Sequence, residues 1–572
     1  MPDPADSPPV DYDLLIRGGT IYDGTGAPGV RGDVGIRGGR LAAVGEAPGT
    51  AAATIDADGL AVAPGFVDIH THYDAQVLWD PLTSISPWHG VTTVVMGNCG
   101  FGVAPTRPEH RDLVLRTLEK VEGMSLECLQ AGCGEAWPFE TFPQYLDAIE
   151  RRGSAINLAV LIGHTPLRLY VMGEAATERA ATADEIARMR AIVREAVGAG
   201  AIGFATSKSP THVGYGGRPV PSRVAELPEI HAVAGALAEA GRGVVQATVG
   251  PGFFIDELGA LSRETGRTIT WTALLAGMLG PGSHRAFLDL SKRVLATGAR
   301  VVPQVACRPL NFEFDLAEPF PFESNPVFQP VSATDRAGKA RLYADAAFRK
   351  RVREAFSSDR AAALRVSWER MTITHVPGHP ELAEAPLTAV AGARGVDPLD
   401  LLFDLSLESD LTARFRFAIL NFEEDEVAEL LGDPDTVLGL SDAGAHASQL
   451  CDACFSTHLL GHWVRERGTL TLPQAVRMLT ARPAEVMGIT DRGRLAAGLA
   501  ADVVLFDPAR VAPSPLRRVN DLPAGAPRLV ADALGIEAVL VGGRVIRRGG
   551  FDAVTPDEAL PGRVLRGGAA AA

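Results

Sequence analysis

The chain has 572 residues, 46% of them hydrophobic, and its 69 acidic side chains outnumber 54 basic ones, which gives a net charge of −15. This size and composition are those of a soluble globular protein with a large core and more than one structural unit. The negative charge argues against nucleic acid and anionic membrane surfaces as partners. We therefore expect a small-molecule substrate; homo-oligomer formation stays open.

The cellular setting follows from what the sequence lacks. No apolar stretch approaches the ~18 residues that span a bilayer. The acidic, proline-rich start does not have the basic-then-apolar plan of a secretory signal, and residues 1–11 are expected to form a disordered tail. Six scattered cysteines suit a reducing compartment. These features predict a cytoplasmic protein.

Short β-type runs stand at both ends of the chain. Residues 14–22 and 34–44 contain Gly-Gly pairs, which is typical of hairpins, and residues 539–546 repeat the pattern. Strands this short need partners from elsewhere in the chain. We expect a composite β-sandwich domain built from residues 12–62 and 495–555.

Residues 63–494 are expected to form a separate catalytic domain, in which apolar runs alternate with helix-like stretches. The stretch 182–197 is one such helix, with Thr182 as its cap and Glu185 at the capping-box spacing. Eight β/α units predict a closed α/β barrel of the (β/α)8 TIM type. The runs are residues 61–69, 91–97, 155–162, 199–205, 243–249, 267–274, 299–306 and 436–441.

The gap between the seventh and eighth runs is unusually long and is rich in aromatic residues and proline near its start. An insertion on the catalytic side of a barrel often forms a lid. We predict a lid-like insertion at about residues 309–365.

Several metal-binding and titratable side chains stand where these runs end. His70 and His72 end the first run and are two residues apart, so both imidazoles point to the same face. Strand ends that are distant in sequence meet at one barrel mouth, where thiolate, imidazole and carboxylate groups reach one cation. Zinc fits this ligand set best, although another divalent metal is not excluded. The other groups are Cys99, His164, Lys208 and Asp442.

With these residues in place, the chain resembles the amidohydrolase superfamily, and within it the D-aminoacylase (N-acyl-D-amino-acid deacylase) branch. The resemblance rests on residues 63–76, Gly97–Gly100, Gly163–His164, Ser441–Asp442 and 491–507. It implies a metal-dependent hydrolase barrel in which His70, His72 and Asp442 hold zinc. Cys99 then stands where this branch uses a cysteine in place of a carboxylated lysine.

The sequence departs from that branch at two strand ends. The branch typically has a histidine at the fifth and sixth strands, whereas this chain has residues 244–250 and 269–275 without one. The sequence is therefore compatible with either one or two zinc ions per chain. Lys208, with His212 close behind, could serve as a carboxylated lysine that restores a second metal. Arg218 and Arg223, in the loop after the fourth run, are candidates with His212 for binding a substrate carboxylate.

The predicted activity is hydrolysis of an amide-type C–N bond, and the resemblance implies N-acyl D-amino acids as the substrates. Asp442 would act as general base and then as general acid toward a metal-activated water, and His164 would help to polarise the carbonyl. Two alternatives stay open. One is a cyclic-amide hydrolase similar to hydantoinases; the other is a barrel that binds a ligand without hydrolysing it.

Overall fold

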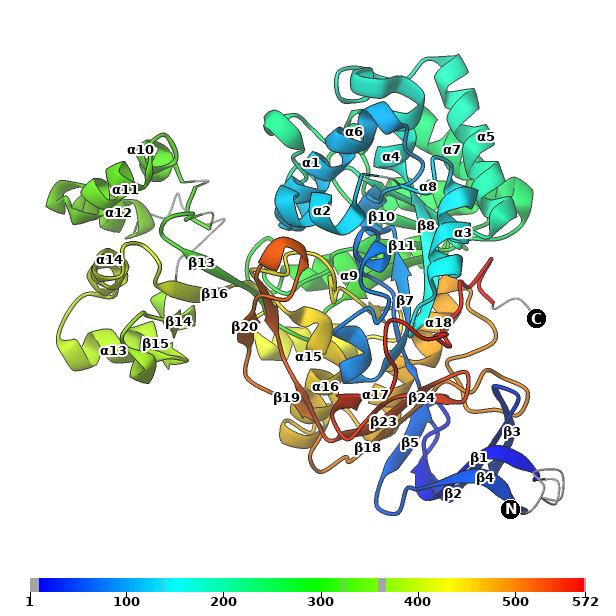
Figure 1. Cartoon of the computed structure of the whole chain (residues 1–572). Helices are drawn as coiled ribbons and strands as arrows, with labels where there is room; N and C mark the ends of the chain where they lie inside the picture. Colours follow the sequence, from blue (N-terminus) through cyan, green and yellow to red (C-terminus); the bar gives the residue numbers. More distant parts are fainter. Residues whose placement is uncertain (1–9, 136, 320, 324, 358–366, 570–572) are drawn as a thin grey trace.

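A computed structural model describes residues 10–135, 137–319, 321–323, 325–357 and 367–569 of the chain. Figure 1 shows a barrel unit, a sheet formed near the two ends of the chain, and a smaller helical unit that projects to one side. Residues 1–9 of the expected 1–11 tail lie outside the described residues. None of the described helices has both the length and the apolar character needed to cross a bilayer.

The barrel consists of eight parallel strands that neighbour one another in chain order. Their burial is nearly complete, as expected for a parallel sheet covered by helices. A parallel bridge between Thr71 and Ala443 joins the first strand's extension to the last strand's extension and closes the ring. The expected (β/α)8 barrel is confirmed. The strands are β6 (Phe66–Asp68), β7 (Val91–Met96), β8 (Asn157–Gly163), β9 (Gly203–Ser207), β10 (Val244–Thr248), β11 (Ile269–Thr272), β12 (Val301–Val305) and β17 (Val437–Leu438).

Helices connect these strands and cover the barrel. The predicted capping box is present: Thr182 accepts a hydrogen bond from the Glu185 amide, and the Glu185 carboxylate accepts one from the Thr182 amide at 2.7 Å. The main helices are α1 (Arg111–Glu122), α2 (Leu126–Cys133), α3 (Phe142–Arg152), α4 (His164–Met172), α5 (Ala183–Ala199), α6 (Pro221–Val224), α7 (Leu227–Ala240), α8 (Ile255–Thr265), α9 (Ser283–Leu295), α15 (Glu424–Gly432), α16 (Phe455–His458), α17 (Leu472–Leu479) and α18 (Ala481–Met487).

Both ends of the chain contribute to a second, nine-stranded sheet. Strand β18 (Val503–Phe506) pairs antiparallel with β5 (Ala61–Pro64), and this pairing joins the two halves. Residues 61–64, which the sequence placed in a barrel run, thus belong to this sheet. The other strands are β1 (Tyr12–Ile21), β2 (Val30–Arg37), β3 (Arg40–Gly45), β4 (Ala51–Asp56), β23 (Ile536–Val541), β24 (Arg544–Arg548) and β25 (Phe551–Asp552).

The insertion between β12 and β17 is larger than the sequence predicted. Strand β16 (Arg414–Leu420) returns beside β13 (Leu310–Asp315), so the expected end at residue 365 is too early. The unit has its own aromatic core, and its body projects away from the barrel (Figure 1). Residues 358–366 of the predicted lid lie outside the described residues, and its lid role stays a prediction. The remaining elements are α10 (Gln329–Ser332), α11 (Arg336–Ala344), α12 (Ala346–Ser357), β14 (Met371–His375), β15 (Ala385–Pro386), α13 (Leu387–Arg394) and α14 (Pro398–Glu408).

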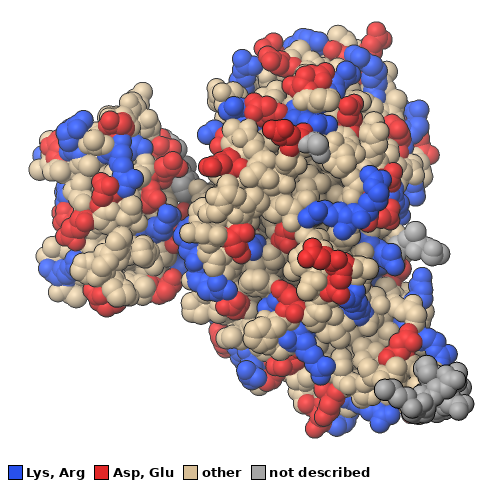
Figure 2. All heavy atoms as spheres, viewed as in Figure 1, with Lys and Arg blue, Asp and Glu red and all other residues tan. Residues whose placement is uncertain are grey.

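Charged side chains of both signs are interspersed over the face shown in Figure 2. The net charge of −15 is thus not gathered into one acidic area on that face. The candidate site is instead defined by buried groups at the carboxyl ends of the barrel strands.

Candidate active site

His70 and His72 lie directly beyond β6, with their ring centroids 5.3 Å apart. Both are buried, with side chains that are 1% and 6% exposed. The backbone fixes their positions, because the His70 amide donates to Asp68 and the His72 amide donates to the Ala443 carbonyl at 2.7 Å. The extended segment thus places both imidazoles on one side, as the two-residue spacing predicts.

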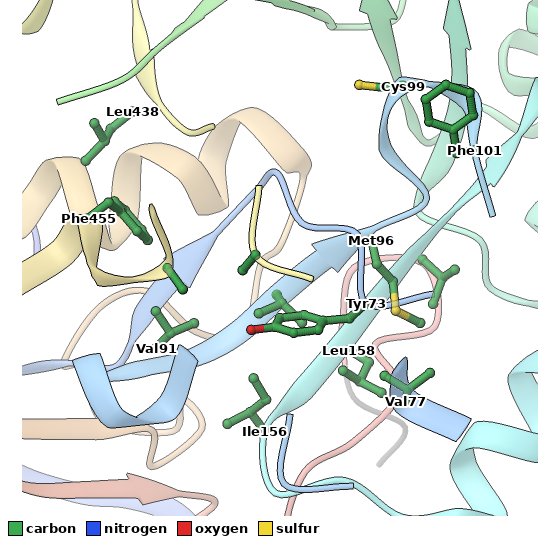
Figure 3. Packing of buried hydrophobic residues seen from close by; sticks show 14 of the residues in the cluster. Tyr73, Val77, Val91, Met96, Cys99, Phe101, Ile156, Leu158, Leu438 and Phe455 are labelled. Carbon is green, nitrogen blue, oxygen red and sulfur yellow. The ribbon is translucent and has the colours of Figure 1, made fainter. Parts of the chain in front are cut away.

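Cys99 follows β7 in a tight turn that carries it to the same place. Gly97 has a φ of 86°, and a Cβ there would lie 2.2 Å from the carbonyl oxygen of Leu161, so only glycine fits. Cys99 itself has a φ of 56°. Its amide donates to Gln246 Oε1 at 2.6 Å, which anchors the turn to β10. Figure 3 shows Cys99 with Phe101 in the loop beyond Met96.

Asp442 reaches the histidines from the last strand. Its amide donates to the His70 carbonyl at 3.1 Å, and its φ is 47°. Its Oδ1 lies 3.4 Å from His70 Nε2 and 3.7 Å from His72 Nε2. The side chain is 27% exposed, in contrast to the buried imidazoles. Asp442 is therefore open to a reactant while it faces the histidines.

Together these groups form a candidate metal centre. Ligand atoms of His70, His72 and Cys99 all lie within 4.8 Å of one another, and Cys99 Sγ is 3.4 Å from His70 Nε2. The outer ring nitrogens have partners too: His70 Nδ1 is 2.8 Å from Gln304 Oε1, and His72 Nδ1 is 3.1 Å from Glu122 Oε1. Such partners orient histidine ligands in metal sites. The donor set fits a soft divalent ion such as zinc.

The electrostatics favour the thiolate of Cys99 and the protonated form of His72, which must lose a proton when a metal binds. Burial alone would raise the pKa of the Cys99 thiol, but the charges and hydrogen bonds of His70 and His72 lower it to about 7. Burial alone would lower the pKa of His72, whereas the carboxylate of Glu122 raises it well above the usual value. Cys99 is therefore closer to a thiolate at neutral pH than an ordinary cysteine.

Comparison with known proteins agrees with this geometry. Residues 53–547 match the amidohydrolase family. The chain belongs to the amidohydrolase family. It is accordingly a hydrolase that acts on carbon–nitrogen bonds, as the sequence predicted.

Individual relatives narrow the comparison. A D-aminoacylase of Alcaligenes xylosoxydans xylosoxydans is 32% identical over 515 residues, which cover 89% of this chain and 90% of that protein. The structure of an N-acyl-D-glutamate deacylase from Bordetella bronchiseptica, complexed with zinc and a phosphonate inhibitor, matches with a TM-score of 0.66, 29% identity and coverage of 97% and 99%. A D-hydantoinase structure, at 15% identity, a TM-score of 0.50 and coverage of 97% and 98%, shares the fold alone.

The structure does not bring His164 into the metal centre of this amidohydrolase. Its Nδ1 lies 2.8 Å from Thr206 Oγ1 and its Nε2 lies 2.9 Å from Glu229 Oε1, so both ring nitrogens have protein partners. Glu229 also pairs with Arg168, which is fully buried. Burial lowers the pKa of His164 despite Glu229. His164 thus belongs to a buried structural network.

Lys208 is also directed elsewhere. Its ammonium group donates hydrogen bonds to the carbonyl oxygens of Arg223 and Ala225. Two carbonyl acceptors suit a charged amine and leave no role for a carboxylated lysine at the metal centre. The structure therefore does not support Lys208 as a metal ligand.

The three residues predicted to bind substrate do not lie together in the structure. His212 packs against Phe101 with ring centroids 5.0 Å apart, and burial lowers its pKa to about 4, so it stands neutral near the centre. Arg223 donates to the His212 carbonyl at 3.0 Å and holds the loop. Arg218 lies outside, 3.8 Å from Glu178, at a surface cavity of about 450 Å³.

The ends of β10 and β11 carry amide and hydroxyl groups in place of imidazoles. Gln246 accepts from the Cys99 amide through Oε1 and donates from Nε2 to Thr272 Oγ1 at 3.3 Å. Within the described residues, no other group of three histidine, cysteine or acidic side chains clusters as His70, His72 and Cys99 do. The described residues therefore form one compact candidate metal centre.

Sequence reasoning missed three residues around the centre. Glu122 and Gln304 contact the outer ring nitrogens, but they come from a helix end and a strand interior that carry no motif. Asp68 accepts from Ser441, and burial raises its pKa to about 7. Asp68 was detectable, because it precedes His70 by two residues and so shares its face.

Proposed function

We propose that this amidohydrolase is a metal-dependent deacylase that releases a carboxylate from N-acyl D-amino acids. The observation that carries the proposal is the convergence of His70, His72 and Cys99 within 4.8 Å, with the partly exposed carboxylate of Asp442 facing them. The similarity to a D-aminoacylase and to a D-glutamate deacylase supports this substrate class.

The proposal assigns one zinc ion to His70, His72, Cys99 and Asp442. Zinc in such a site polarises a carbonyl group and lowers the pKa of water. The absence of an imidazole from β10 and β11, and the hydrogen bonds that Lys208 makes, favour one ion over two. Gln304 and Glu122 would keep the two ring Nε2 atoms directed inward.

Asp442 would carry the proton transfers. Its carboxylate is the exposed group of the centre, so it can accept a proton from the attacking water and return that proton to the amide nitrogen. An amine leaving group requires this second transfer. A small cavity of about 30 Å³, lined by Asp442, Ala443 and Gly444, adjoins the carboxylate and has room for a water molecule.

The decisive experiment measures metal content and enzyme kinetics in parallel. Elemental analysis of protein purified without chelator should give about one zinc per chain in the wild type, and less in Asp442→Ala and Cys99→Ala. Cys128→Ala is the matched control, because Cys128 is equally buried but lies outside the centre. Absence of metal from every preparation would refute the hydrolase mechanism.

A substrate panel tests the specificity. N-acetyl derivatives of several D-amino acids should be hydrolysed, with little turnover of their L enantiomers or of 5-substituted hydantoins. Turnover of hydantoins alone would replace the proposal with the cyclic-amide hydrolase. Metal binding without turnover of any compound would indicate a ligand-binding barrel.

A further inference from the structure

A second cavity lies at the opposite end of the barrel from the metal centre. It occupies about 270 Å³ and is formed where the chain enters β10, β11 and β12. The end of α18 and Gly567, near the end of the sequence, complete its wall. A volume of about 30 Å³ per water molecule means that the cavity has room for several waters or a small organic ion.

Three arginines stand at equivalent places in this cavity. Arg242 and Arg267 each precede their strand by two residues, and Arg300 directly precedes its strand. No described carboxylate forms an ion pair with any of the three. Arg267 is half-buried, whereas Arg242 and Arg300 are exposed, and all three line one cavity without a carboxylate partner among the described residues.

Backbone hydrogen bonds hold the three arginine side chains in place, but these bonds use only some of their N–H donors. Arg242 donates to the Val197 carbonyl, Arg300 donates to the Gly266 carbonyl at 2.8 Å, and Arg267 makes a long contact to the Thr265 carbonyl at 3.4 Å. Each guanidinium has five N–H donors. Most of these donors are therefore available to a ligand in the cavity.

The acidic group in the cavity wall does not neutralise this charge. Glu485 is paired with Arg494 and lies 3.7 Å from Arg477. The cavity thus has a positive balance within a chain whose net charge is −15. An anion is the ligand that this arrangement would attract.

We propose that this cavity binds a phosphoryl group, supplied either by inorganic phosphate or by a small phosphate ester. Planar guanidinium forks match the oxygens of a phosphoryl group and bind them in pairs. The bound anion would join the loops before three barrel strands. It would also hold the C-terminal segment, since Gly567 packs against Arg242. This site is independent of the proposed deacylase activity.

The test uses the full-length protein and two ligands. Calorimetry and thermal unfolding are measured with sodium phosphate and with glycerol 3-phosphate, against sodium chloride at matched ionic strength. A ligand that binds the native state raises the unfolding temperature with concentration. We expect a rise of several degrees, with saturable binding. Tighter binding of the ester would identify a phosphorylated metabolite, and equal binding would identify free phosphate.

The variants Arg267→Gln, Arg300→Gln and their double variant locate the site. These two side chains make one weak or partly exposed backbone contact each, so the fold should tolerate the changes, which circular dichroism checks. Binding should weaken at least tenfold in the double variant. Arg31→Gln is the control, because Arg31 is 69% exposed in a surface ion pair of the other sheet. Equal phosphate binding by the double variant, or none by the wild type, would overturn the proposal.

Discussion

The most informative single perturbation is at Glu122, the acidic partner of His72. Its Oε1 lies 3.1 Å from His72 Nδ1, and both side chains are less than one-tenth exposed. The carboxylate raises the pKa of His72 against the opposing effect of burial. Replacing Glu122 with Gln removes the charge but keeps an acceptor, whereas replacing it with Leu removes both.

The magnitude can be worked from this geometry. When zinc is bound, His72 is a neutral imidazole whose Nδ1 faces the Glu122 carboxylate 3.1 Å away, and a hydrogen bond to a charged group contributes about 1.5–3 kcal/mol. Loss of an outer partner of a histidine ligand typically weakens metal binding by about 10–100-fold, or about 1.4–2.7 kcal/mol. The loss of zinc affinity in Glu122→Gln should lie near the lower bound, and the loss in Glu122→Leu near the upper bound.

Competition for zinc against a chromophoric chelator measures this effect directly. The expected order of affinity is wild type, then Glu122→Gln, then Glu122→Leu. Glu127→Gln is the control, because Glu127 is exposed on the neighbouring helix. Equal zinc affinity in all four proteins would refute the idea that Glu122 positions His72.

Three further predictions concern stability. His89 is buried, and burial lowers its pKa to about 3, so the native protein holds it neutral. The free energy of unfolding of the wild type should therefore fall by up to about 1.4 kcal/mol per pH unit below 6.5. Urea unfolding of His89→Gln should lack this part of the pH dependence. Glu229→Gln leaves Arg168 buried without its counter-charge and should lower the free energy of unfolding by about 3–5 kcal/mol. An unchanged midpoint of urea unfolding would contradict this prediction. Gly97→Ala should lower both melting temperature and zinc content, whereas the helical Gly198→Ala, whose Cβ meets no atom within 4 Å, should not.

The barrel was predictable because its strands are buried on both faces and so read as continuous apolar runs. The first run was the exception. Residues 61–64 and 66–68 are both fully buried, but they belong to two different sheets. The division falls at Gly65, where a Cβ would lie 2.1 Å from Thr92 Oγ1. An apolar run predicts that a strand is buried, but it does not predict to which sheet the strand belongs.

The candidate site was predictable only where chemistry coincides with a strand end. His70, His72, Cys99 and Asp442 meet this condition and lie together. His164 meets it as well, yet its partner Glu229 comes from a helix 65 residues further along. A strand-end position places a side chain at the barrel mouth, but the neighbours decide whether its nitrogens remain available.

Gln246 lies in β10, the strand at whose end the related branch is expected to supply a metal ligand, and it has a different role here. Its amide oxygen holds the Cys99 amide, and its amide nitrogen contacts Thr272 on the next strand. Cys99 has a positive φ, a conformation that costs free energy for a residue other than glycine. The hydrogen bond that the Cys99 amide donates to Gln246 offsets part of that cost. Gln246 therefore helps to fix the Cys99 thiol beside His70 in the candidate metal centre, although it is not one of the clustered donor residues.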